Sequence, residues 1–232
     1  MSRRPPDFIA LLETNSSDWG MEARWSDYTR VASATAPGKR DTGIELYKHS
    51  ACPYLVETVL QGADGKMLLV KVFTPDTYYY LLIVHAPQEK VTLSYALFWL
   101  RLWAQLTALI DPRRLLILGD VNSLFRTEDR EEPSTKRGWE TFCRVAGLLE
   151  LTEHTHIPHG TYSCYGGAGS RIDTAATTAE SEVRILAAKY WPSTLISDVH
   201  TPLLLHVDFK NEDPDKPYPN CTKRLPEFHL KE

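Results

Sequence analysis

Cysteine is scarce in this sequence, and its few copies are not spaced as metal or redox motifs are. The 232 residues include four cysteines, Cys52, Cys143, Cys164 and Cys221, and no two of them form a C-x-x-C pair. This spacing argues against a zinc site of the usual kind and against a disulfide framework. We expect reduced cysteines in an intracellular protein.

Long apolar runs are also absent. No segment reaches the roughly 20 consecutive apolar residues that a membrane-spanning helix needs. The first residues, MSRRPPDF, lack the apolar stretch of a secretory signal. The sequence therefore predicts an intracellular protein that has no membrane partner.

The sequence has no large excess of charge of either sign. Its 26 Lys and Arg residues stand against 30 Asp and Glu residues, which gives a net charge of −4. This balance excludes a nucleic-acid binder that works through overall basic charge, as histones do. It is compatible with a local basic groove, because the field at a site depends on where the charges lie.

The apolar content is sufficient for a large core. Hydrophobic residues make up 43% of the chain and six tryptophans are present, so the chain is predicted to fold. From Lys210 onward the composition shifts to Asp, Lys, Pro and Asn. We expect one domain over residues 1–209, followed by a polar, proline-containing tail or linker over residues 210–232.

Many short apolar runs bounded by turn residues predict strands, and only two segments have helical spacing. A turn at residues 62–66 predicts a hairpin between the strands on either side of it. The pattern indicates a mixed α/β protein with mostly antiparallel sheets. Strands are expected at 8–12, 28–34, 42–47, 54–60, 67–73, 78–85, 114–120, 149–152, 162–164, 171–175, 183–188 and 203–209, and helices at 91–110 and 138–147.

The segment 114–123, RLLILGDVNS, carries the strongest functional signal. Its apolar run predicts a buried strand that ends at Gly119 and is followed by Asp120 and Asn122. Residues two apart on extended backbone point to the same side, so both polar side chains are expected to extend beyond the end of the strand. A carboxylate and a carboxamide in that position can bind a hard metal ion or activate a water molecule. The alternative is a capped turn at the end of the strand, because Gly-Asp-x-Asn is also common turn chemistry.

Other acidic and histidine residues also lie at the ends of apolar runs. If a sheet gathers these ends at one edge, they form a pocket suited to metal-assisted hydrolysis of a phosphoester. In such a site a base activates water, and hydrogen-bond donors stabilise the negative charge that develops on the phosphoryl oxygens. The residues concerned are Glu13, His85, Asp120, Asn122, Asp173, Asp198 and His200.

The order of four short motifs resembles the endonuclease/exonuclease/phosphatase superfamily. These motifs are LLET at the start, LGDVN in the middle, SRID later and SDVHTPL near the end. They are most similar to the endonuclease domain of non-long-terminal-repeat retrotransposons, over residues 6–209. The resemblance implies a four-layer α+β sandwich, in which two mostly antiparallel sheets pack face to face with helices outside and the active site lies on one rim.

The resemblance also implies a role for each matching residue. Glu13 matches the metal ligand, Asp120 and Asn122 match the residues that position the attacking water, with Asn122 also on the phosphate, and His200 matches the catalytic histidine that Asp173 orients. We add three candidates to this set: Asp198 as a second metal ligand, Arg171 as a substrate-binding residue and His85 as a further catalytic residue. The implied cofactor is Mg²⁺, with Mn²⁺ as a substitute, and the implied substrate is DNA. A monomer is expected, and a nuclear location would follow from the retroelement resemblance alone.

The chain departs from the family pattern in three places. The family's first strand, which carries an asparagine, has no counterpart before the Glu13 strand, so we expect that strand to be missing. His85 occupies the place of a tyrosine, which leaves either a phosphate donor or a histidine that caps a strand end. Val199 separates Asp198 from His200, which are adjacent in the family.

These departures leave three functions open. The first is metal-dependent cleavage of DNA. The second is a catalytically silent, decayed domain derived from a retroelement, since catalytic residues that act as a unit also fail as a unit. The third is a phosphomonoesterase of the same superfamily.

Overall fold

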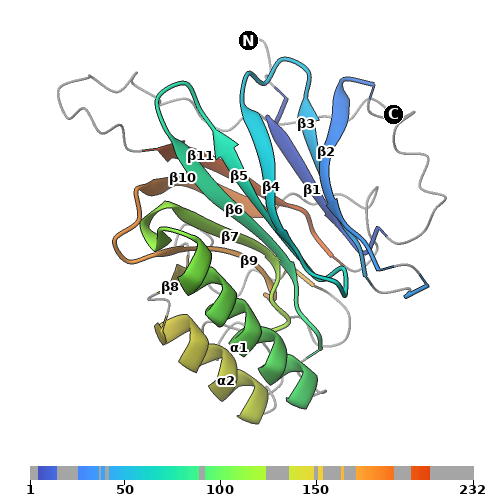
Figure 1. Ribbon diagram of the computed structural model, residues 1–232, viewed down its shortest axis with the longest axis vertical. Helices are drawn as coiled ribbons and strands as arrows, with labels where there is room; N and C mark the ends of the chain where they lie inside the picture. The colour runs from blue at the N-terminus through green and yellow to red at the C-terminus, as the bar shows by residue number, and fades with distance from the viewer. Residues whose placement is uncertain are drawn as a thin grey trace.

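A computed structural model describes residues 5–14, 26–36, 38–39, 42–88, 92–123, 136–148, 151–153, 163–164, 171–190 and 200–209 (Figure 1). The strands are β1 (Phe8–Leu12), β2 (Tyr28–Ala34), β3 (Ile44–His49), β4 (Leu55–Gln61), β5 (Met67–Phe73), β6 (Tyr78–His85), β7 (Leu115–Asp120), β8 (Leu151–Glu153), β9 (Asp173–Thr178), β10 (Val183–Tyr190) and β11 (Leu203–Phe209). The helices are α1 (Thr92–Leu109) and α2 (Lys136–Leu148), and a short 3₁₀ helix, η2 (Pro112–Arg114), precedes β7.

The largest sheet has six strands in the order β4-β5-β6-β7-β9-β8. All neighbours in it are antiparallel except β6 and β7, which run parallel. A parallel pair needs a crossover connection, and α1 supplies it between these two strands. Strands β5 and β6 are largely buried, which explains their nearly continuous apolar sequences.

Both helices lie on one face of this sheet (Figure 1). The side chains of Tyr95, Trp99, Leu102 and Leu106 enter the core from α1, at the i, i+4, i+7 and i+11 spacing of one helix face. The Trp99 ring meets Phe142 of α2 edge to face, with the ring centroids 5.0 Å apart. This contact joins the two helices over the sheet.

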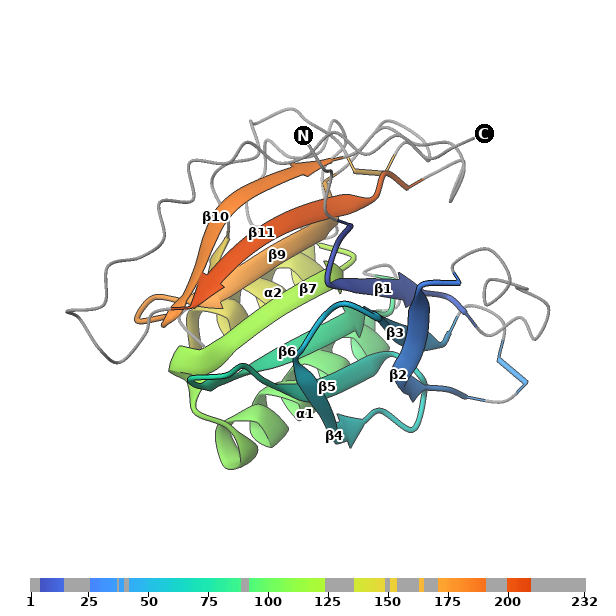
Figure 2. The ribbon, with the colours of Figure 1, turned by 90° about the horizontal axis from the view of Figure 1, so that it is seen from above.

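Two smaller sheets cover the opposite face (Figure 2). One has the strand order β1-β3-β2 and the other consists of β10 and β11, all of them antiparallel. Apolar side chains of β2, β3 and β10 form a second core with those of β5, β6 and β7. Within the described part of the chain, β1 pairs with β3 alone and β11 with β10 alone.

The α+β class and the face-to-face packing of mostly antiparallel sheets are confirmed. Two points differ from the expected sandwich. The layer opposite the six-stranded sheet consists of two separate sheets, and in the described ranges helices cover only one side. The predicted tail, residues 210–232, lies outside the described residues, so the domain boundary stays a prediction. No helix among the described residues is long and apolar enough to cross a membrane.

Candidate active site

The registers of three adjacent strands bring three functional candidates to one edge of the large sheet. His85 is the last residue of β6 and lies beside Asp120, the last residue of β7. Asp120 in turn lies opposite Asp173, the first residue of β9. Because β6 and β7 are parallel and β9 is antiparallel to β7, two strand ends and one strand start share this edge. The predicted gathering of strand ends therefore occurs for these three residues.

Gly119 is the residue that allows β7 to approach β6 closely. Its φ angle is +129°, which L side chains rarely adopt, and a Cβ atom at this position would lie 2.1 Å from the Val84 carbonyl oxygen. A side chain at position 119 would therefore push β7 away from β6. The glycine of the LGDVN motif is thus explained by backbone contact immediately before Asp120.

The chain turns directly after Asp120, which corrects the extended-backbone argument made from the sequence. Asn122 has a φ of +49°, in the left-handed region that asparagine tolerates. Its backbone N–H donates to Asp120 Oδ1 over 2.7 Å, and its Nδ2 donates to the Ala86 carbonyl over 2.7 Å. The alternative considered above, a capped turn, is therefore the observed geometry. Asn122 is fixed by this turn and not by strand alternation.

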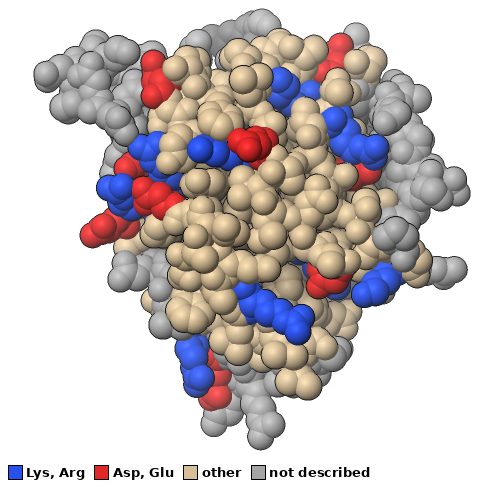
Figure 3. Space-filling model, in the orientation of Figure 1, with Lys and Arg blue, Asp and Glu red and all other residues tan. Residues whose placement is uncertain are grey.

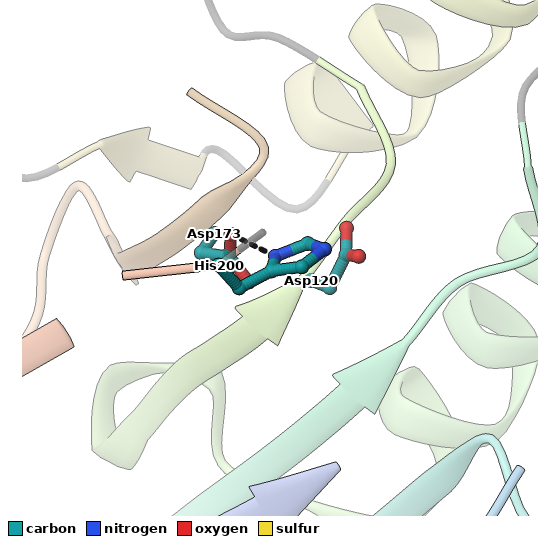
Figure 4. A group of neighbouring side chains, drawn as sticks. All are labelled: Asp120, Asp173 and His200. Carbon is teal, nitrogen blue, oxygen red and sulfur yellow. Dashed lines mark hydrogen bonds and ion pairs between the residues drawn. The ribbon is translucent and has the colours of Figure 1, made fainter. Parts of the chain in front are cut away.

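His200 is held against Asp173 although the two residues are 27 positions apart in sequence. Its Nδ1 lies 2.8 Å from Asp173 Oδ2. Figure 4 shows the imidazole ring between the carboxylates of Asp173 and Asp120. One ligand atom from each of the three residues can be chosen so that all of them lie within 4.8 Å of one another.

A buried serine joins the backbones on both sides of this pair. Ser163 is fully buried, and its hydroxyl oxygen accepts a hydrogen bond from the Asp173 N–H over 3.0 Å. Its carbonyl oxygen accepts from the Thr201 N–H over 2.7 Å. Tyr190 contributes from β10, where its hydroxyl donates to the Asp173 carbonyl over 2.6 Å. The positions of Asp173 and His200 are therefore fixed through their backbones.

The electrostatics of the site follow from burial and from its excess of carboxylates. Burial, and secondly the Asp173 carboxylate, raise the pKa of Asp120 well above its usual range. The hydrogen bond to Asp173 raises the pKa of His200 well above that of an ordinary histidine, against the effect of burial. His200 is thus positively charged at neutral pH.

Glu13 and His85 form a second contact in the same region. His85 Nε2 lies 3.2 Å from Glu13 Oε1, and the Glu13 side chain is 56% exposed. Burial lowers the pKa of His85 to about 4, with smaller effects of Lys66 and His200. The imidazole is therefore neutral at neutral pH, and it contacts the Glu13 carboxylate through Nε2. A direct catalytic role for His85 stays a prediction.

Arg171 and Asp198 are the two remaining predicted site residues. Arg171 is 2% exposed and lies two residues before Asp173, so its guanidinium is inside the protein. A role in phosphate binding stays a prediction. Asp198, the second predicted metal ligand, and the inserted Val199 lie outside the described residues.

The donor set fits a hard divalent cation. Glu13 contributes to the shifts in the pKa of both Asp120 and His200, so these groups act on one another electrostatically. A buried carboxylate whose neighbours are further carboxylates is stabilised in its charged form by a bound cation. The carboxylates of Asp120, Asp173 and the exposed Glu13 supply oxygen atoms, the ligands that Mg²⁺ prefers. His200 Nδ1 is already engaged by Asp173.

The comparisons with known proteins agree on the fold. No protein-family model matches the sequence, and no curated protein matches it. Among solved structures, the endonuclease domain of TRAS1, a telomere-specific non-LTR retrotransposon, is 16% identical, with a TM-score of 0.65 over 88% of this chain and 86% of that chain.

Two further structures match at similar levels. The AP endonuclease LMAP from Leishmania major is 16% identical, with a TM-score of 0.60 over 86% of this chain and 78% of that one. The 3′-5′ exonuclease NExo from Neisseria meningitidis is 14% identical, with a TM-score of 0.60 over 88% of this chain and 90% of that one.

All three proteins are members of the endonuclease/exonuclease/phosphatase superfamily. The resemblance recognised in the sequence is therefore confirmed at the level of the fold. The chain has the deoxyribonuclease I-like fold, which in these three neighbours belongs to nucleases.

Proposed function

We propose that the chain is a metal-dependent hydrolase of phosphodiester bonds in DNA, an endonuclease of the retrotransposon type. The observation that carries the proposal is the position of the His200–Asp173 pair next to Asp120, at the shared edge of β7 and β9. A charged donor beside a carboxylate is the minimal arrangement for cleaving a phosphoester with water.

Asp120 and Asn122 orient the attacking water in this proposal. The Asp120 carboxylate accepts its proton or aligns it toward phosphorus, and the turn formed with Asn122 fixes the carboxylate through the 2.7 Å bond from the Asn122 N–H. This preorganisation matters because a misplaced base loses most of its effect on the rate.

His200 stabilises the negative charge that develops on the phosphoryl oxygens. The hydrogen bond that His200 Nδ1 donates to the Asp173 carboxylate keeps the imidazole charged at neutral pH, and the Nε2–H is then the donor toward substrate. Such preorganised donors supply the largest share of catalysis in many hydrolases. Asp173 orients the ring and compensates its charge.

Glu13, with Asp198 as a further candidate, would hold Mg²⁺ or Mn²⁺. A bound divalent ion acts there as a Lewis acid toward the phosphate. The Glu13 carboxylate is kept in position by the neutral His85 ring. Arg171 would assist with phosphate binding.

The structural neighbours support a polynucleotide substrate. The three proteins are named as a retrotransposon endonuclease domain, an AP endonuclease and a 3′-5′ exonuclease. A retrotransposon-type activity would imply a nuclear location. A phosphomonoesterase or a silent, decayed domain would have the same fold. Assays of activity on DNA and on a phosphomonoester therefore distinguish these alternatives.

The experiment is cleavage of supercoiled plasmid by the purified chain, with Mg²⁺, with Mn²⁺ and with EDTA. A small phosphomonoester is assayed in parallel. The proposal predicts nicked plasmid only when the metal is present and little release of phosphate from the monoester. The reverse preference supports the phosphomonoesterase, and a folded chain inactive on both substrates supports the silent domain.

A further inference from the structure

The outer face of α1 is apolar, although it points away from the core. Among the described residues, four of the five large apolar side chains that are exposed lie on this helix. They are Leu93 at 72% exposure, Leu97 at 40%, Leu100 at 43% and Leu109 at 47%. The helix therefore exposes to solvent an apolar surface of the kind that helices of globular proteins normally bury.

Three of these leucines form a continuous stripe with an alanine. At 3.6 residues per turn, Leu93, Leu97, Leu100 and Ala104 fall within an arc of about 60°. We name these four residues the α1 stripe. It lies opposite the buried face of the helix, which carries Trp99. Leu109, near the end of the helix, falls outside this arc.

Charge is nearly absent from the same helix. Arg101 is the only charged residue in the 18 residues of α1, and the helix contains no acidic residue. Figure 3, in the orientation in which α1 faces the viewer, shows few charged side chains scattered over a largely uncharged surface. A helix that is apolar on all sides is typical of a buried position. By contrast, α2 alternates polar and apolar residues and has an ordinary amphipathic sequence.

We propose that the α1 stripe is the interface between two copies of this chain, with the two α1 helices packed antiparallel about a two-fold axis. An interface of this symmetry uses the same surface on both subunits, so an uncharged stripe is complementary to itself. A partner that binds through acidic and basic groups would find one arginine on this helix. The sequence alone led to the expectation of a monomer, which this proposal replaces.

The spacing of large and small residues favours the antiparallel arrangement. If the axis passes between Leu97 and Leu100, each Leu97 meets Leu100 of the second copy, and each Leu93 meets Ala104 of the second copy. Large residues facing small ones interdigitate well. The two Arg101 side chains are then separated by about 7 Å along the helix axis, at a rise of 1.5 Å per residue. A parallel pair would place alanine against alanine and Arg101 against Arg101.

The size of the stripe sets the strength of the dimer. Its four residues span about 16 Å of helix, and the partly buried Phe98 and Trp103 flank it. A contact of this size is at or below the lower end of stable interfaces, which begin near 1,200 Å² in total. We therefore expect a dissociation constant of about 1–100 μM.

Sedimentation velocity of the full chain at about 0.2 μM and about 500 μM tests the proposal, because these concentrations bracket the expected range of the dissociation constant. The expected result is a shift from monomer to dimer, with Leu97→Glu at least about 10-fold weaker in association, as burying an unpaired charge predicts. Leu55→Glu is the matched control: Leu55 is 69% exposed on β4, so this variant should dimerise as the native chain does. Circular dichroism establishes that each variant is folded.

A cysteine pair tests the orientation. Leu93→Cys and Ala104→Cys chains are mixed and oxidised, with the native chain treated in the same way as background. The antiparallel dimer predicts a cross-link in the mixture and none in Ala104→Cys alone. A native chain that stays monomeric at the high concentration, or a dimer that Leu97→Glu leaves intact, overturns the proposal. So does a cross-link that forms in Ala104→Cys alone.

Discussion

Asp173 Oδ2 lies 2.8 Å from Nδ1 of His200, and this contact determines the charge of the imidazole. Asp173 begins β9, whereas His200 precedes β11 on a different sheet. The pair thus connects the large sheet to the layer that covers it. Its electrostatic effect is to keep His200 protonated at neutral pH.

Asp173→Asn should return the pKa of His200 toward the 6.5 of an ordinary histidine. The pKa is raised in the folded state, so the stabilisation from this pair is complete below pH 6.5 and is lost as the pH rises through the raised value. Titration of the His200 ring protons by NMR measures this directly. An unchanged His200 pKa in the variant would contradict the role given to Asp173.

Ser163→Ala should lower the rate of plasmid cleavage about 10-fold with little change in KM, because the Asp173 N–H loses its acceptor and the carboxylate shifts. Loss of the buried hydrogen bond should also cost about 1–3 kcal/mol of stability. The control is Thr178→Val, which removes a buried hydroxyl at the far end of β9, where it donates to the Pro112 carbonyl. This control should lose stability but retain its rate. An equal loss of rate in both variants would assign Ser163 a purely structural role.

Gly119→Ala should destabilise the fold by about 3 kcal/mol or more, because the new Cβ meets the Val84 carbonyl and the φ of +129° is unfavourable. Urea unfolding followed by circular dichroism gives the change in free energy. Gly147→Ala is the control, since a Cβ there meets nothing within 4 Å and alanine favours helix. A mild effect at Gly119 would mean that β6 and β7 separate easily.

Acid should destabilise the chain partly through His85. Its pKa falls from 6.5 to about 4 on folding, so the unfolded state binds more protons between these values and stability decreases as the pH falls through them. Between pH 7 and pH 5 this contribution amounts to about 2 kcal/mol. His85→Gln, which has no such titration, should lose less stability over this interval in urea unfolding. An equal loss in both chains would contradict the neutral, buried imidazole.

The sequence was sufficient to predict most strands and both helices. Five expected strands have the observed bounds, namely 8–12, 28–34, 67–73, 78–85 and 203–209, and the helix expected at 91–110 is α1. The pattern is reliable in β5, which is buried along most of its length, and in α1, which buries one face. The parallel pairing of β6 and β7 is harder to predict from the sequence, since it depends on contacts between segments that are distant in the chain.

The sequence predicted which residues form the candidate site better than it predicted their geometry. Asp120, Asp173 and His200 were named from ordered motifs, and the structure brings them together. The turn at Asn122 replaced the expected extended backbone because Asp120 accepts the Asn122 N–H. Ser163 was missed as a positioning residue: its contacts are to backbone groups of residues far away in sequence, and such contacts leave no local pattern.

The most direct measurement is the rate of plasmid cleavage by Asp120→Asn with Mg²⁺, compared with the native chain under the same conditions. This change keeps the size of the side chain and its acceptor for the Asn122 N–H, and it removes the carboxylate. We predict a loss of at least about 1,000-fold in rate, with the circular dichroism spectrum unchanged. Cleavage at the native rate by this variant would contradict an active site built on Asp120, Asp173 and His200.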